Sequence, residues 1–206
     1  MISIRPVFGF AAGAVVLFMS IGPTGLMGCK ATGVGDPCTP EQEYNTQFNG
    51  FDEQEVNVES KSFQCQTRLC LVNHFRGRVS CPYGQDRDGK APADAKVCTV
   101  PGDPEVSITG NPADAKKGKT VPAQCADRTA DKAVYCSCRC ANVDGKTDDG
   151  ANYCTCPDGF GCEQIVSSIG AGDTGLTGAY CIKAGTKFDR GNSCAVYCDP
   201  ATQKCP

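Results

Sequence analysis

The chain of 206 residues contains 17 cysteines, one histidine and no tryptophan. Such a cysteine content, with aromatic residues at 7%, is typical of a disulfide scaffold rather than of a domain with a large apolar core. The net charge of −3, from 20 basic and 23 acidic residues, argues against nucleic-acid binding, and the single histidine excludes metal sites that need two imidazoles.

The first thirty residues are arranged like a secretory leader. Arg5 precedes an apolar run over 7–19, which has about the length of a signal-peptide core and is short for a membrane span. The leader ends in Leu26-Met27-Gly28-Cys29, which resembles the lipobox of bacterial lipoproteins. The resemblance implies cleavage before Cys29, a lipid on its sulfur and N-acylation. An ordinary signal peptide or an N-terminal anchor is the alternative interpretation of residues 1–28.

Cysteine parity favours the lipoprotein interpretation. If Cys29 carries lipid, 16 cysteines remain, an even number that can close eight disulfides in an oxidising compartment. The disulfide candidates are Cys38, Cys65, Cys70, Cys81, Cys98, Cys125, Cys136, Cys138, Cys140, Cys154, Cys156, Cys162, Cys181, Cys194, Cys198 and Cys205. Several acyl chains would anchor the protein stably in a membrane. Because Lys30 rather than aspartate follows Cys29, lipoprotein sorting favours the outer membrane, facing either the periplasm or the exterior.

Residues 29–60 form the predicted lipidated N-terminus and acidic tether. Between 31 and 60 the chain carries seven acidic residues, no lysine or arginine, and one cysteine, Cys38. Such a composition favours a solvated spacer that lifts the following domain off the lipid surface.

Residues 61–125 form a predicted cysteine-rich β module, in which 61–85 are basic and contain no acidic residue. The apolar stretch 68–75 predicts a strand, and a turn at Arg76-Gly77 would return it over 78–81 as a hairpin. Two interpretations of this stretch remain open: an anion- or partner-binding patch, or a solvated strand face. The patch residues are Arg68, His74, Arg76 and Arg78. The stretch 86–122 is rich in Pro, Ala and Gly and predicts loops.

Residues 126–206 form a second predicted module, a cysteine-rich β-hairpin. Strict alternation over 133–140 would place Cys136, Cys138 and Cys140 on one strand face, opposite partners among Cys154, Cys156, Cys162 and Cys181. The run from Cys154 to Cys162 resembles the tail of an epidermal-growth-factor-like module. The upstream cysteines do not follow that module's spacing, so we interpret the likeness as shared turn chemistry.

Other chemistries have weaker signals. The cluster from Cys136 to Cys156 would suit Zn²⁺ or Cu⁺ if its thiols were free. The stretch 170–175 matches a dinucleotide-binding glycine pattern but is followed by no helical periodicity. The aspartates at 86–89 and 144–149 lack the spacing of a calcium loop. We predict no cofactor, and a lone His74 without a marked partner predicts no enzyme.

Together these observations predict a small disulfide-rich fold, mainly β-hairpins and loops, with little helix outside the signal peptide. The chain resembles uncharacterised cysteine-rich lipoproteins of myxobacterial type. We expect a non-enzymatic envelope lipoprotein that acts as a structural, protein-interaction or adhesion module, with an envelope or surface protein as its partner. The alternatives are thiolate metal binding by Cys136–Cys156 and an enzyme built around His74.

Overall fold

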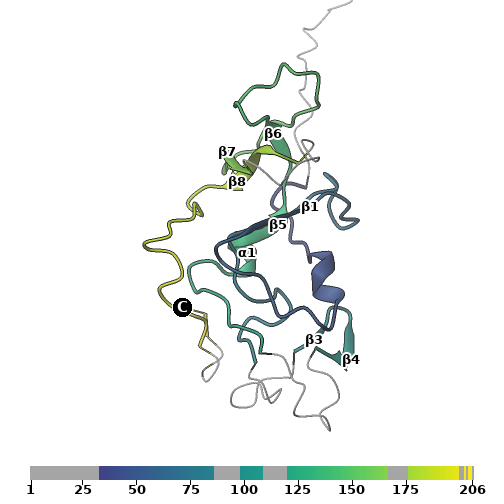
Figure 1. Ribbon diagram of the computed structural model, residues 1–206, viewed down its shortest axis with the longest axis vertical. Helices are drawn as coiled ribbons and strands as arrows, with labels where there is room; N and C mark the ends of the chain where they lie inside the picture. Colours follow the sequence, from purple (N-terminus) through teal and green to yellow (C-terminus); the bar gives the residue numbers. More distant parts are fainter. Residues whose placement is uncertain are drawn as a thin grey trace, which may run out of the picture.

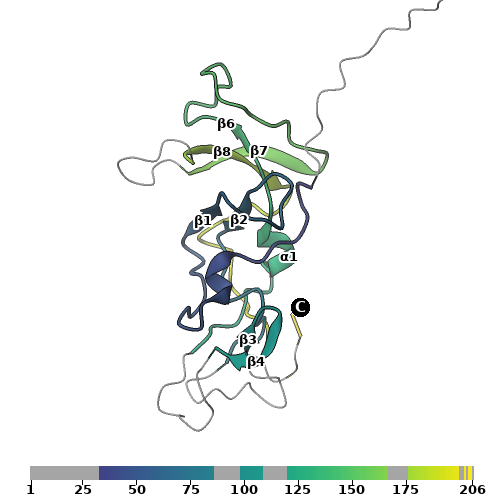
Figure 2. The same cartoon turned by 90° about the vertical axis from the view of Figure 1, so that its right-hand side faces the viewer.

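The computed structural model describes residues 33–85, 98–108, 120–166 and 176–199, together with 202, 204 and 205. Within this part of the chain, three small antiparallel sheets follow one another along the molecule (Figures 1 and 2). The leader with Cys29, the glycine-rich stretch 170–175 and the aspartates at 86–89 lie outside the described residues.

The middle sheet has the strand order β1-β2-β5, with β1 at Val56–Glu59, β2 at Cys70–Asn73 and β5 at Val134–Cys136. The second sheet has the order β6-β8-β7, with β6 at Arg139–Ala141, β7 at Phe160–Val166 and β8 at Gly178–Lys183. At the opposite end of the molecule, β3 (Thr99–Val100) pairs with β4 (Asp103–Ser107). The helices are short: η1 at Glu41–Tyr44 and α1 at Ala130–Ala133.

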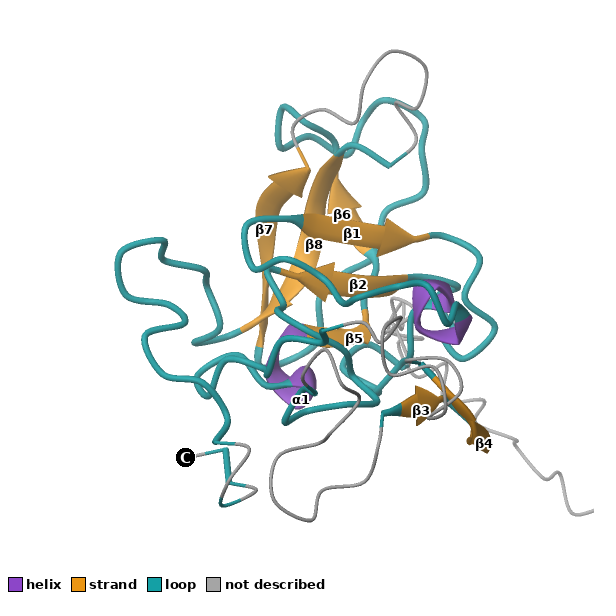
Figure 3. Cartoon of the chain, turned by 60° about the horizontal axis from the view of Figure 1, so that its bottom comes forward, coloured by secondary structure: helices purple, strands orange, loops and turns teal. Residues whose placement is uncertain are grey.

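The middle sheet is covered on both faces. Alternation along β2 sends Cys70 and Val72 into one apolar cluster with Phe75, and Leu71 into another with Tyr180 of the second sheet. All residues of β2 and β5 are buried for this reason. In Figure 3 the strands β1 and β2 lie in front of β6 and β8, so the two sheets form two layers.

Among the described residues, eight disulfides supplement the small apolar clusters. They are Cys38–Cys70, Cys65–Cys136, Cys81–Cys98, Cys125–Cys194, Cys138–Cys154, Cys140–Cys162, Cys156–Cys181 and Cys198–Cys205. The prediction of a disulfide-rich fold of strands and loops with little helix is confirmed for the described residues. Four-residue helices and strands of two to seven residues bury too little apolar surface to be stable alone, which is where such bonds matter most.

The acidic segment 33–60 is not a solvated tether. It contributes η1 and the edge strand β1, and Cys38, Glu43 and Phe51 are buried in the folded domain. The prediction was wrong because most of the acidic side chains lie on the outer surface, while the few buried residues of the segment are spaced irregularly along it.

The predicted hairpin over 68–81 is also wrong. The strand β2 pairs with β1 before it and with β5 more than sixty residues after it, and not with 78–81. Gly77 instead approaches the backbone of Pro122, where an added Cβ would collide with the Pro122 carbonyl oxygen. The φ of Gly77 is +86°, which glycine adopts without strain, and this explains why position 77 is a glycine.

The predicted single face of Cys136, Cys138 and Cys140 is divided between two sheets. The strand β5 ends at Cys136 and β6 begins at Arg139. Between them Ser137 links the two sheets, because its amide donates to the Leu69 carbonyl and its hydroxyl donates to the Cys181 carbonyl. Cys138 and Cys140 bond within the predicted set of partners, whereas Cys136 bonds to Cys65. This last bond and the β2–β5 pairing both cross the boundary predicted at residues 125 and 126.

Candidate functional site

The predicted basic patch is not one surface. Arg78 is fully buried, whereas Arg68 is exposed, and His74 and Arg76 are half-buried. Arg76 is 3.7 Å from the Glu53 carboxylate and already has a counterion. The four residues therefore do not present their charges together, and Arg78 is a structural residue.

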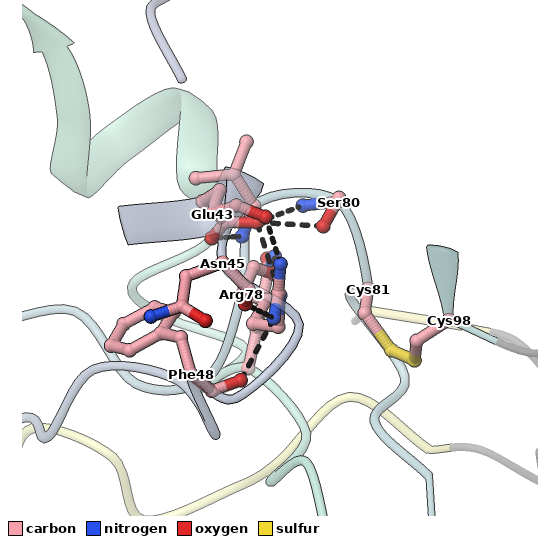
Figure 4. A network of polar contacts seen from close by, with 9 residues as sticks. Glu43, Asn45, Phe48, Arg78, Ser80, Cys81 and Cys98 are labelled. Carbon is pink, nitrogen blue, oxygen red and sulfur yellow. Dashed lines mark hydrogen bonds and ion pairs between the residues drawn. A yellow bond between two sulfur atoms is a disulfide. The ribbon is translucent and has the colours of Figure 1, made fainter. Parts of the chain in front are cut away.

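Arg78 forms a buried ion pair with Glu43, the third residue of η1 (Figure 4). Its Nε lies 3.4 Å from Glu43 Oε2, and its guanidinium also donates to the carbonyl oxygen of Phe48 at 2.8 Å. Glu43 accepts in return from the Ser80 amide and hydroxyl, at 3.2 and 2.6 Å. Burial lowers the pKa of Arg78, and the neighbouring carboxylate of Glu43 opposes that effect. The network fixes η1 to the chain around residue 80.

The loop that follows β1, residues 60–69, is fixed from inside. Its ends are joined by the Ser62 amide, which donates to the Arg68 carbonyl at 3.1 Å. Arg68 has a φ of +62°, and its own amide donates to the Cys65 carbonyl. The bond from Cys65 to Cys136 ties the loop to the middle sheet. The disulfide therefore holds the loop to the sheet, and the Ser62–Arg68 hydrogen bond joins its two ends.

Two further contacts join this loop and β1 to η1. Gln64 and the backbone of Thr39 exchange hydrogen bonds of 3.0 and 2.9 Å. The Glu41 amide, at the start of η1, donates to Glu59 Oε2 at 3.0 Å. These hydrogen bonds fix the distance between η1 on one side and the loop with β1 on the other.

A groove of about 550 Å³ lies between these walls, and we call it the aromatic groove. One wall contains Thr39, Glu41 and Tyr44. The other contains Glu59, Lys61, Ser62, Phe63, Gln64 and Arg68. Phe63 is 88% exposed and Tyr44 is 49% exposed, which is unusual for rings on such fixed supports. The Arg68 guanidinium lies 4.5 Å from the centre of the Phe63 ring, so a cation–π contact orients this side chain.

A second hollow of about 450 Å³ lies beside the groove and shares Glu41 and Glu59 with it. We call it the amide hollow because Gln42, Asn45 and Asn57 line it. Together the two hollows form one extended, uneven surface at the open edge of the middle sheet, where β1 has a strand neighbour on one side only.

The sulfur cluster predicted as an alternative metal site is oxidised. Cys138, Cys154 and Cys181 approach within 4.8 Å of one another, but each of the three sulfurs is part of a disulfide. A metal-binding cysteine must be a thiolate, so these sulfurs would have to be reduced before they could bind Zn²⁺ or Cu⁺.

His74 is held in a structural setting. Its ring stacks on Phe188 with 4.0 Å between the ring centres, and Nδ1 lies 3.0 Å from the Glu53 carbonyl oxygen. Burial lowers the pKa of His74, and the positive charges of Arg128 and Arg190 add to the effect. Both effects favour the uncharged form of the imidazole.

Sequence reasoning missed the aromatic groove, because half of it lies in the presumed tether. The available signal was Phe63, an aromatic residue between polar neighbours and two residues before Cys65. No protein-family model, curated protein or solved structure matches the chain. Among the described residues, no helix has the length and apolar character that a membrane crossing requires.

Proposed function

We propose that the protein is a bacterial envelope lipoprotein, anchored through Cys29 in the outer membrane, that serves as a non-enzymatic interaction and adhesion module. One observation carries the proposal. All 16 described cysteines bond to one another, so within the chain the seventeenth, Cys29, has no cysteine left to pair with. Lipidation of the cysteine that closes Leu26-Met27-Gly28-Cys29 accounts for the odd number.

The arrangement of the described residues supports an interaction role. Disulfides form and persist outside the reducing cytosol, and a domain held by them resists proteolysis there. The aromatic groove exposes Tyr44 and Phe63 on supports that do not need to order on binding, which lowers the entropic cost of recognition. His74 is stacked and hydrogen-bonded within the fold, which supports a structural role for it rather than catalysis.

Intact mass of the detergent-extracted protein tests the proposal. We expect a chain that begins at Cys29 and carries acyl mass. It should take up no alkylating reagent before reduction and sixteen alkyl groups afterwards. A seventeenth addition after reduction would show that Cys29 is not lipidated and would contradict the proposal.

The same measurement tests the alternative function, thiolate metal binding by Cys136–Cys156. Free thiols within Cys136–Cys156 before reduction, or a metal ion retained in the native spectrum, would favour a thiolate metal site there. Reaction at Cys154 and Cys156 should be examined first, because both are at least partly accessible.

A further inference from the structure

We propose that the aromatic groove and the amide hollow bind an uncharged carbohydrate chain. This inference rests on the proposed function, since it names the ligand that such an adhesion module would hold. Three features of the surface carry it: the exposed rings, the balance of charge, and polar atoms that lack partners.

The exposed rings supply flat apolar surface. Phe63 and Tyr44 leave a large part of their rings in water although their backbones are fixed by hydrogen bonds and disulfides. Aromatic rings are flat and rigid, and their electron-rich faces pack against C–H groups. The C–H faces of sugar rings fit them, and burial of Phe63 would remove an unfavourable exposure.

The charges of the groove cancel. Glu41 and Glu59 are matched by Lys61 and Arg68, so a charged ligand of either sign would meet a like charge. In addition, Arg68 already lies over the Phe63 ring. A ligand without net charge avoids this penalty.

Two polar oxygens at this surface lack partners within the described part of the chain. Ser62 is only 2% exposed, lines the aromatic groove, and its Oγ has no hydrogen bond there. Gln42 lines the amide hollow, and its buried Oε1 is likewise unpaired. An unsatisfied buried polar group is unfavourable, and a bound hydroxyl would relieve it because a hydroxyl can both donate and accept a hydrogen bond.

The amides of the second hollow extend the same chemistry. Asn57 and Asn45 line it beside Gln42, and each side-chain amide carries both donors and an acceptor. The two hollows meet at Glu41 and Glu59, so a chain of several sugar rings would run from the rings of the groove to the amides.

The test uses the full-length lipidated protein in fluorescent phosphatidylcholine vesicles, added to gene-deleted cells of the organism that produces it. We expect the vesicles to bind, and binding to survive proteinase K treatment of the cells and about 1 M sodium chloride. Periodate, which cleaves the vicinal diols of sugars, should abolish binding when applied to the cells beforehand. Protein-free vesicles are the control.

Two substitutions in the groove and one control substitution locate the site. Phe63→Ser should weaken binding about tenfold, while Tyr197→Ser, which removes a 46% exposed ring elsewhere, should leave it unchanged. Ser62→Ala should weaken binding about fivefold without lowering the unfolding midpoint, because it deletes an unsatisfied hydroxyl. A purely structural Ser62 would leave binding unchanged.

The outcomes separate the two proposals. Binding that resists periodate but is lost after proteinase K would overturn the carbohydrate ligand and leave adhesion to a protein. Loss of binding in high salt would indicate a charged ligand, and full binding by Phe63→Ser would place the site elsewhere. If wild-type vesicles bind no cells, the adhesion function itself is wrong.

Discussion

At the scale of single residues, the buried pair of Glu43 and Arg78 holds η1, which supplies Glu41 and Tyr44 to one wall of the groove. Glu43→Gln keeps the shape of the side chain but leaves Arg78 charged and without its counterion in the interior. We expect a loss of about 3–5 kcal/mol in the free energy of unfolding, measured by guanidinium titration with disulfides intact. Asp144→Asn, on an exposed loop, is the matched control. A loss below about 1 kcal/mol would mean that the backbone carbonyls around Arg78 satisfy it alone.

A second residue-scale prediction concerns pH. Because burial lowers the pKa of His74 below its usual 6.5, the unfolded chain binds more protons there than the folded one. The stability linked to His74 is therefore present above the usual pKa of 6.5 and falls as the pH drops below that value. His74→Asn, in which asparagine tolerates the positive φ of this position, should remove the part of the loss that begins below about pH 6.5. Identical pH profiles for both proteins would contradict the prediction.

The pKa of the Asp149 carboxyl is held at about 2 by its hydrogen bonds from Tyr153 and Asn142. Its folded-state pKa lies below the usual 3.8, so the stability linked to it is present above that value and is lost as the pH falls toward 2. The acid response of Asp149 therefore begins at a lower pH than that of His74, whose usual pKa is 6.5.

At the scale of elements, the disulfides differ in what they hold. Cys65–Cys136 closes a separation of 71 residues and fixes the loop of the groove, whereas Cys198–Cys205 closes 7. Loop-closure entropy predicts that replacing Cys65 and Cys136 by alanine lowers the free energy of unfolding by about 4 kcal/mol, and that replacing Cys198 and Cys205 lowers it by about 2 kcal/mol. Thermal unfolding of the two variants measures which loss is larger. Vesicle binding should be lost with the first pair only, and its loss with the second would show that the groove depends on the C-terminal segment.

At the scale of the whole molecule, the cysteine content and the scarcity of aromatic residues were enough to predict the fold class. The sheet arrangement was not predictable, because β2 pairs with β5 far along the chain and Ser137 separates two sheets within an unbroken alternation. The groove was hidden for a similar reason. Burial of Glu43 requires Arg78, 35 residues away, and no local pattern links them.

The order in which the sulfurs pair has a consequence for how the protein matures. Only Cys81–Cys98 and Cys198–Cys205 join cysteines that are neighbours along the chain; each of the other six bonds spans at least one further cysteine. In the exported protein that we propose, an oxidase that joins thiols as they emerge from a translocon would therefore make mostly wrong pairs. We expect such a chain to mature through repeated thiol–disulfide exchange, which takes seconds to hours. Its yield would then depend on an isomerase in the same compartment.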